Sequence, residues 1–596
     1  MLLGRTLGCT SVRLFGTAFL IFGGAVTPAF AFKDSVPDWV RAAAAQKLPA
    51  YPPETSAVLL LDETTLSVAP DGKATEHHRH VVKILRPSGR GEGVVVVNFD
   101  KNSKLNSLHV WSIGPDGHEY ALKDNEISEE GYPGEGIGFE DDRYKVARPP
   151  GRDPGGVIAY EYDQRVTPYI SERTWIFQDT IPHVTQSLTI ELPPGYTYGT
   201  VWAHHDKQAP IDLERQRYRW EMNATPALDL DRISMRPTEL ALAGRMTVHY
   251  GPTGPGASSL DTWQGIGDWY NRLSQDRLGA NAEIAAKAAA LTAGKTDFYD
   301  KAEAIAEFVQ TQVRYFAIEM GIGGWQPHPA ADVFHNLYGD CKDKATLLSA
   351  MLSSVGIHSA LMMVDDRRGV VDPDAPSILG NHMIGAIEIP VGYNSPRLRS
   401  VVTAKTGKRY LIFDPTWDKT PFGQLEHELQ ASYGVLFEKD SSEIVKLPVM
   451  SPELNRIQRT ASFQLQSDGT LKGSVVESRF GDLAEMRRQV YTNATAKEQE
   501  AFEDRQLGED LTNFHAADFK VENLHALNKD LTTSYSLTAS GFGKTMGPLL
   551  MVRPRVLGSD QHQMDNRPRL VPIDLSQTRM VKDDYTIQLP EGYAMD

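Results

Sequence analysis

Of the two cysteines in the chain, Cys341 has the surroundings of a reactive thiol. It stands in the stretch YGDCKDKATLL, where the Gly339-Asp340 pair is typical of a turn and the hydrophobic spacing that follows is typical of a helix. The sulfur is therefore predicted to lie at a helix N-terminus, where unpaired backbone N–H groups and the helix dipole favour the nucleophilic thiolate. The same N–H groups can bind an oxyanion. The alternative interpretation is a buried, unreactive cysteine, which would more naturally lie further along the apolar stripe of the helix.

A cysteine nucleophile needs a general base, usually a histidine that a carboxylate or an amide orients. Among the 17 histidines, His382 begins an apolar, strand-like run after a loop rich in Pro, Asp and Gly. Asp414 ends another such run and precedes Pro415, which cannot continue a strand ladder. A helix start and two adjacent strand ends can converge on one cleft, so Cys341, His382 and Asp414 are the candidate catalytic residues. On spacing alone, His382 also fits an ordinary strand-end histidine, and Asp414 an ordinary turn residue.

Metal and phosphate motifs are weaker. In the segment 76–80, EHHRH, His78 and His80 would share one face of a strand, but two histidines lack the third ligand of a zinc site, and Arg79 adds positive charge nearby. His427 has no second histidine at helical spacing, so a zinc-peptidase motif is absent. The glycine-rich run at 321–324 is not followed by the helix of a phosphate-binding loop. We therefore expect no metal site and no cofactor.

The N-terminus has the composition of a secretory signal peptide. Arg5 and Arg13 precede an apolar run and then the small-residue pattern Ala29-Phe30-Ala31, which predicts cleavage before Phe32 and a periplasmic or otherwise exported protein. Cleavage would remove Cys9 and leave Cys341 without an internal disulfide partner. The formal charge of -16 becomes -18 without the two arginines, since the segment has no acidic residue. This charge argues against nucleic acid as a partner, and no later apolar run has the roughly 18 residues that span a membrane.

The length of 596 residues indicates several domains. Residues 57–250 alternate short strand-like segments with turns, except for 129–154, which lacks periodicity and is predicted to be a loop. Helical spacing and then strand-like runs follow a Gly/Pro-rich stretch at 251–256, and β patterning returns after about residue 456 with a polar helical piece near 482–511. The sequence thus predicts a multidomain α+β protein. Its parts are a signal peptide at 1–31, a β-sandwich at 32–250, an α+β domain at 257–445 and a C-terminal β-sandwich at 455–596.

The segments around the candidate residues occur in a characteristic order: Gly324-Trp325-Gln326-Pro327, then the 339–345 stretch GDCKDKA, then Asn381-His382, then the 413–417 stretch FDPTW. In this order they resemble the transglutaminase-like superfamily of bacterial exported proteins. More specifically, the chain is similar to proteins with an N-terminal DUF3857 domain and a C-terminal DUF3858-type β domain. The resemblance implies a papain-like central fold with Cys341 as the nucleophile, His382 as the general base and acid, and Asp414 as its orienting partner. Gln326 is a further candidate, as an oxyanion donor.

The function that the resemblance implies is amide acyl transfer through a thioester on an exported enzyme. The substrate would be a peptide or protein amide, possibly of the cell envelope. Resolution of the thioester by water would give an amidase or peptidase, whereas an amine would give transglutamination and protein cross-linking. The alternative is a non-catalytic envelope binding or scaffold protein whose β domains bind peptide or glycan. The sequence leaves the substrate and the oligomeric state open.

Overall fold

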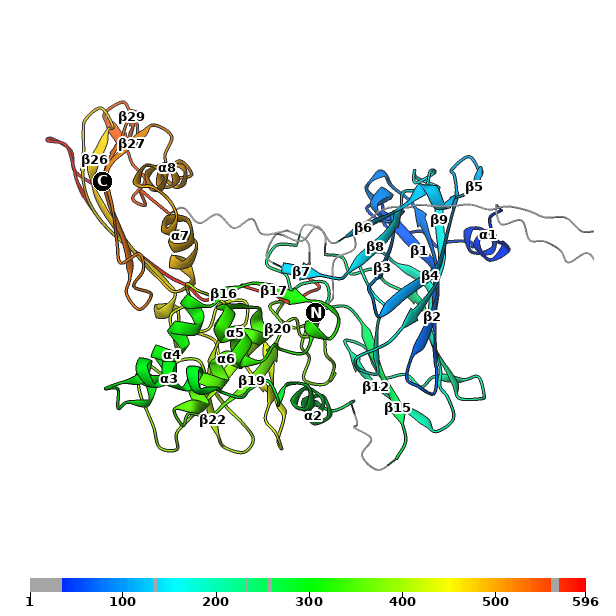
Figure 1. Ribbon diagram of the computed structural model, residues 1–596. Helices are drawn as coiled ribbons and strands as arrows, with labels where there is room; N and C mark the ends of the chain where they lie inside the picture. Colours follow the sequence, from blue (N-terminus) through cyan, green and yellow to red (C-terminus); the bar gives the residue numbers. More distant parts are fainter. Residues whose placement is uncertain (1–34, 132–137, 231–232, 255–259, 559–567, 596) are drawn as a thin grey trace, which may run out of the picture.

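The computed structural model describes residues 35–131, 138–230, 233–254, 260–558 and 568–595. The predicted signal peptide at 1–31 lies outside the described residues. Figure 1 shows a β-rich N-terminal region in blue to cyan, a mixed central region in green, and a C-terminal region of strands and helices in yellow to orange. The protein is therefore multidomain and mostly β with some helices, as the sequence predicts. Within the described residues, no helix has the length and apolar character needed to cross a membrane.

An eight-stranded sheet, in the order β13-β14-β11-β1-β2-β9-β4-β5, forms the N-terminal region. Neighbouring strands are antiparallel except β1 and β11, which are parallel. The strands are β1 (Ala57–Val68), β2 (Ala74–Ile84), β4 (Ser103–Ile113), β5 (Glu119–Ala121), β9 (Val157–Val166), β11 (His183–Glu191), β13 (Ile211–Asp212) and β14 (Arg217–Thr225).

Two three-stranded sheets cover one face of this large sheet, which is called the inner face below. One, in the order β10-β15-β12, packs through Trp175 and Val248 on Leu188 and Ile190. The other, in the order β3-β8-β6, packs on a second apolar cluster around Val82. Helix α1 (Asp38–Ala44) packs on the opposite face. The strands of the small sheets are β3 (Val95–Phe99), β6 (Ile127–Gly131), β8 (Arg143–Ala147), β10 (Glu172–Ile176), β12 (Tyr196–Ala203) and β15 (Arg245–Pro252).

The central region packs helices against an antiparallel six-stranded sheet, in the order β21-β22-β20-β19-β23-β24. The predicted strand-like runs are confirmed as β20 and β22, and the helix that begins at Cys341 ends just before Gly356, which has a φ of 80°. The elements are α2 (Trp263–Ser274), α3 (Ala282–Thr292), α4 (Phe298–Gln312), α5 (Ala330–Asn336), α6 (Cys341–Ser354), β19 (Ser359–Val364), β20 (His382–Ile389), β21 (Val401–Thr403), β22 (Arg409–Phe413), β23 (Tyr433–Phe437) and β24 (Glu443–Lys446).

Helix α6 lies in the middle of this region. Its residues from Cys341 to Leu352 are buried, because α3, α4 and α5 contact it on one side and the sheet on the other. Leu348 packs with Ile387 and Phe413 of the sheet and with Val309 of α4 in one continuous core. Burial on nearly every side holds the helix start in a fixed position relative to the strand ends of β20 and β22.

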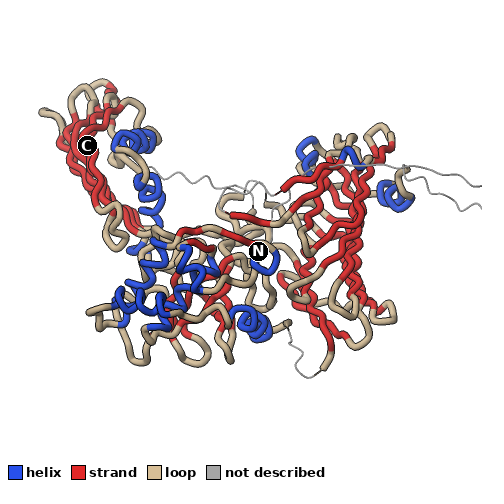
Figure 2. The backbone as a smooth tube through the Cα atoms, viewed as in Figure 1, coloured by secondary structure: helices blue, strands red, loops and turns tan. Residues whose placement is uncertain are grey.

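The C-terminal region differs from the predicted sandwich. It contains one five-stranded sheet, in the order β27-β28-β26-β25-β31, and a small hairpin. Leu507 and Leu511, near the end of the predicted helical piece, pack on Phe463 and Val475 of the sheet, so helices occupy the place of a second sheet (Figure 2). The elements are β25 (Arg456–Leu465), β26 (Leu471–Phe480), α7 (Asp482–Thr492), α8 (Ala496–Leu507), β27 (Phe514–Glu522), β28 (Leu531–Ala539), β29 (Lys544–Met546), β30 (Leu549–Met551) and β31 (Met580–Gln588).

The predicted loop at 129–154 also differs, because it contains β8 and the short strand β7 (Gly138–Glu140). Strand β7 pairs in parallel with β17 (Ala317–Glu319) of the central region, far away in the sequence. A three-residue strand whose partner is this distant has no periodicity that a sequence pattern could reveal. The pairing joins the N-terminal and central regions close to the short parallel pair β16 (Arg314–Tyr315) and β18 (Tyr338–Gly339), which leads into α6.

Candidate active site

Cys341 is the first residue of α6 and is 2% exposed. The Asp340 carboxylate accepts a hydrogen bond from the Asp343 N–H, and the Asp343 carboxylate accepts one from the Asp340 N–H, each at 3.3 Å. This reciprocal capping box fixes the helix start. At Gly339, a Cβ atom would lie 2.5 Å from Cβ of Asp343, so the turn before the cysteine has no room for a side chain. The sequence prediction that the sulfur lies at a helix N-terminus is confirmed.

His382 and Asp414 are brought together by the antiparallel pairing of β20 and β22. Nε2 of His382 lies 2.6 Å from Oδ2 of Asp414, and the aspartate is 2% exposed. The other oxygen, Oδ1, accepts hydrogen bonds from the Thr416 N–H at 2.8 Å and from its hydroxyl at 2.7 Å. Since Nε2 is engaged by Asp414, Nδ1 is the ring nitrogen left for the sulfur of Cys341.

The electrostatics of the pair favour a charged imidazole. Burial acts against it, yet the Asp414 carboxylate and a hydrogen bond with the Cys341 side chain raise the pKa of His382 well above its usual value. Burial likewise opposes ionisation of Asp414, but His382 and the two Thr416 donors lower the pKa of this carboxyl. Of the three residues that the sequence singled out, the His382 imidazole therefore interacts with the Asp414 carboxylate on one side and with the Cys341 side chain on the other.

A narrow hollow of about 20 Å³ lies beside the sulfur and the imidazole. Aromatic and apolar side chains line most of it, including Trp269, Tyr270 and Trp325. The Tyr270 hydroxyl is buried without a hydrogen-bond partner among the described residues, and burial together with the nearby Cys341 raises the pKa of this phenol well above its usual value. An amide reaching the sulfur would therefore enter a largely desolvated space, in which hydrogen bonds and charges act strongly.

Gln326, the predicted oxyanion donor, does not line this hollow. Its Nε2 instead donates a hydrogen bond of 2.9 Å to the Leu273 carbonyl, near the end of α2. The structure thus assigns this side chain a contact between the 321–327 turn and a helix.

Two buried ionisable groups near the histidine–aspartate pair were not found from the sequence. Glu426 is 1% exposed, and neither carboxyl oxygen has a hydrogen-bond partner among the described residues. Burial and the neighbouring Asp414 raise the pKa of Glu426 well above its usual value, which favours the protonated carboxyl. Nζ of Lys344 donates to the carbonyls of Gln310 and Val313, and burial lowers the pKa of the lysine to about 8. Thr416, which binds Asp414, was not found from the sequence either. Unlike Glu426 and Lys344, it had a local sequence signal, since it lies two residues after an aspartate in a turn.

Comparison with models of known protein families gives two matches along the chain. Residues 285–375 match the model of the transglutaminase-like superfamily, and residues 70–229 match DUF3857, described as a domain of unknown function with a solved structure. The chain therefore contains a DUF3857 match in its N-terminal region and a transglutaminase-like match later on. The second match includes Cys341 and ends before His382 and Asp414.

Among solved structures, a protein of Parabacteroides distasonis described as a "putative protease" is similar over 81% of this chain and 93% of its own. The identity is 13% and the TM-score is 0.51, so the likeness concerns the fold. An M1 zinc metallopeptidase of Deinococcus radiodurans is 10% identical over 32% of this chain and 42% of its own. The TM-score of 0.18 is too low to indicate a shared fold. No protein matched in a search of curated sequences.

Proposed function

We propose that the protein is a cysteine-dependent acyl-transfer enzyme that acts on amides, with Cys341 as the nucleophile, His382 as the general base and acid, and Asp414 as the orienting carboxylate. The observation that carries the proposal is the contact series of the Cys341 side chain, the His382 ring and the Asp414 carboxylate at the start of a buried helix. The transglutaminase-like match, and the fold shared with the protein described as a "putative protease", support the same class of chemistry.

In the proposed reaction, the Cys341 thiolate attacks the carbonyl carbon of a peptide or protein amide. The tetrahedral oxyanion forms next to the N–H groups that begin α6, and the C–N bond breaks as the His382 imidazolium gives its proton to the departing amine. The acyl group is then held as a thioester on Cys341. Water, deprotonated by His382, releases a carboxylate, or a second amine releases a new amide, and either step returns the thiol.

Further parts of the proposal concern the whole chain. We place the mature protein in the periplasm or another exported location after loss of residues 1–31, with a DUF3857-like domain at 32–250, the catalytic domain at 257–445 and a DUF3858-like domain at 455–596. The sheets support these limits, because the large N-terminal, central and C-terminal sheets each draw their strands from one of these ranges, apart from Lys446 at the end of β24. N-terminal sequencing of the secreted protein tests the cleavage site and the location.

Alkylation of Cys341 tests the proposed chemistry directly. Because the thiol is 2% exposed, the small neutral reagent iodoacetamide is the suitable probe. A thiolate stabilised by the His382 imidazolium should be alkylated rapidly at about pH 6 to 7. Slow labelling that follows an ordinary thiol titration, or a thiol that reacts only after denaturation, would contradict the proposal and favour the non-catalytic alternative. Activity-based labelling of envelope extracts with an acyl electrophile, with Cys341→Ala as the control, would then identify the acyl group.

A further inference from the structure

The inner face of the eight-stranded sheet has a polar centre. At its two ends, apolar side chains pack under the small sheets, but in between, the inward positions of β1 and β2 include Asp62, Thr64, His78 and His80. All four residues are buried or half-buried. A run of metal-binding side chain types in the interior of a β-sheet requires partners, because unpaired polar groups are costly to bury.

Three ligand atoms converge at this centre. Oδ2 of Asp62 lies 3.0 Å from Nδ1 of His80 and 3.6 Å from Nε2 of His78, and the three atoms lie within 4.8 Å of one another. With metal–ligand bonds of about 2.1 Å, the ligand atoms of a tetrahedral zinc site are separated by about 3.4 Å. The spacing therefore approaches that of three corners of such a tetrahedron without movement of the backbone.

The neighbours of the two imidazoles hold them in suitable orientations. Nδ1 of His78 is hydrogen-bonded to the Thr64 hydroxyl at 2.9 Å, which leaves Nε2 as the nitrogen directed to Asp62. A ligating histidine typically has its second ring nitrogen engaged in this way. Tyr160 stacks on both imidazole rings, with ring centroids 5.6 Å from His78 and 4.8 Å from His80. The site thus has an outer layer that fixes the rings.

Two objections that the sequence raised against a metal no longer hold. The third ligand comes from Asp62 of the neighbouring strand, which the register pairs with His80. Arg79 points to the opposite face, where its guanidinium binds Glu161 at 2.5 Å and covers the Trp39 ring. Its positive charge is therefore compensated outside the histidine cluster.

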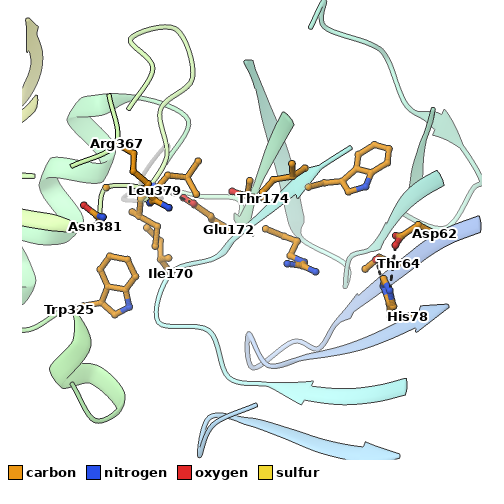
Figure 3. A pocket seen from close by; sticks show the side chains of 15 residues that line it. Asp62, Thr64, His78, Ile170, Glu172, Thr174, Trp325, Arg367, Leu379 and Asn381 are labelled. Atoms are coloured by element: carbon orange, nitrogen blue, oxygen red, sulfur yellow. Dashed lines mark hydrogen bonds and ion pairs between the residues drawn. The ribbon is translucent and has the colours of Figure 1, made fainter. Parts of the chain in front are cut away.

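The centre opens into a cavity of about 480 Å³ between the N-terminal and central regions (Figure 3). Asp62, Thr64 and His78 line one end, and Trp325 and Asn381 line the other, beside the candidate catalytic histidine. A cation held by three protein ligands would have its fourth position available to water or to an anionic group that enters this cavity.

We propose that Asp62, His78 and His80 form a binding site for a divalent transition metal of the zinc type, with one coordination position facing the cavity between the two regions. Two imidazoles and one carboxylate suit Zn²⁺ and its spectroscopic substitute Co²⁺, whereas Mg²⁺ and Ca²⁺ prefer oxygen ligands alone. The site is separate from Cys341 and goes beyond the proposed acyl transfer.

Cobalt titration of the chelator-treated, tag-free mature chain tests the site. We expect one Co²⁺ per chain with the visible absorption of a tetrahedral complex, and competition by Zn²⁺. Asp62→Asn and His78→Gln, which nearly keep the side-chain shape, should each weaken binding by more than about 100-fold, because loss of an outer-layer contact alone costs about 10- to 100-fold. Thr64→Val should fall in that lower range. Near-ultraviolet circular dichroism of each variant checks that the domain remains folded.

The matched control is His77→Ala, because His77 is on the opposite face of β2, where its Nδ1 binds Asp163 at 3.0 Å. It should leave Co²⁺ affinity unchanged, as should Cys341→Ala and His358→Ala, the latter in a second, more exposed group with Glu388 and Glu438. Absence of Co²⁺ and Zn²⁺ binding by the wild-type chain, or binding that Asp62→Asn and His78→Gln leave intact, would overturn the proposal. So would binding that depends on Cys341 or His358.

Discussion

Asp414 determines which nitrogen of His382 faces the sulfur. Both donors of Thr416 point to Oδ1 of Asp414, so Oδ2 is the oxygen that accepts from Nε2–H of the imidazole. In this tautomer Nδ1 can take the proton of the thiol, as a general base must. In the proposed reaction, the aspartate therefore acts on the cysteine through the orientation of the ring.

The Asp414→Asn variant tests this role. Thr416 will hold the carbonyl oxygen of the asparagine, which turns its NH₂ group to His382 and forces Nε2 to accept. Nδ1 then carries the hydrogen and cannot act as the base. We expect iodoacetamide to alkylate Cys341 at least about 10-fold more slowly at pH 6 to 7, because the thiol loses its general base. Asp418→Asn, at a nearby exposed carboxylate, should not change the rate; equal rates in the two variants would remove Asp414 from the site.

Glu426 gives a pH-dependent prediction. The pKa of this carboxyl is raised in the folded protein, so folding keeps a proton that the unfolded chain loses above pH 4.5. The stability contribution of Glu426 is therefore complete below pH 4.5 and is lost as the pH rises towards the folded pKa. We expect Glu426→Gln to be as stable as wild type near pH 4.5 and to gain about 1.4 kcal/mol per pH unit above it.

Guanidinium unfolding, followed by the exposure of Cys341 to a thiol reagent, measures the effect of Glu426→Gln in the central region specifically. Asp440→Asn, at an exposed carboxyl of the same region, is the control and should show no such pH trend. A constant difference between Glu426→Gln and wild type from pH 5 to pH 8 would mean that Glu426 is ionised in the folded protein.

At the scale of elements, the start of α6 depends on a buried charge pair. The Asp340 carboxylate caps the helix and also binds the Lys342 ammonium, and both side chains are almost fully buried. The next acidic group, Glu319, is 3.9 Å from the same ammonium. Removal of one partner from such a pair leaves an uncompensated charge in the interior.

Asp340→Asn separates the two roles of this residue, because asparagine caps helices as well as aspartate but does not balance Lys342. We expect the free energy of unfolding to fall by about 3 kcal/mol, at the lower end for a broken buried pair because Glu319 remains. Asp332→Asn, in the first turn of the neighbouring α5, removes an exposed carboxylate and should cost only a few tenths of a kcal/mol. Denaturant unfolding of both variants checks the difference, and equal losses would show that Asp340 acts only as a cap.

The elements also show what the sequence could predict. The helix at Cys341 and the strand starting at His382 have local signals, namely a turn pair followed by helical spacing and an apolar run after a loop. No local signal predicts that Glu426 lies beside Asp414 or that Asp62 lies beside His80, because those contacts arise only when separate strands and loops pack. The prediction of a C-terminal β-sandwich was wrong for a related reason. Alternation of apolar and polar residues identifies the strands, but it does not show that the helical piece folds back and covers the sheet.

At the scale of the molecule, all three regions hold the loop 365–381 that leads to His382. From the N-terminal region, Nη2 of Arg245 donates to the Val370 carbonyl at 2.8 Å, and the Glu172 carboxylate accepts from the Ile378 N–H at 3.2 Å. From the C-terminal region, Asp574 and the Ser576 carbonyl bind the guanidinium of Arg368. The fixed position of the loop before His382 thus depends on contacts from both the N-terminal and the C-terminal regions.

Arg245→Met should loosen this loop without changing any residue of the proposed triad. The variant keeps much of the buried side-chain volume but leaves the Leu240 and Val370 carbonyls without their donor. Loss of a hydrogen bond from a charged group is worth about 1.5 to 3 kcal/mol, so amide exchange in 366–381 should rise by roughly 10- to 100-fold. Arg217→Met, which removes an exposed arginine paired with Glu191, is the control. Unchanged exchange in the loop would show that the interface does not order it.

The Arg368 contacts also have a consequence for timing. Asp574 lies 206 residues beyond Arg368 in the chain. During synthesis, the cysteine, the histidine and the aspartate are all made well before the segment that completes the clamp on the loop between them. A nascent or truncated chain therefore lacks part of what holds the loop before His382, and the clamp is completed only when the C-terminal region has folded back onto the first two.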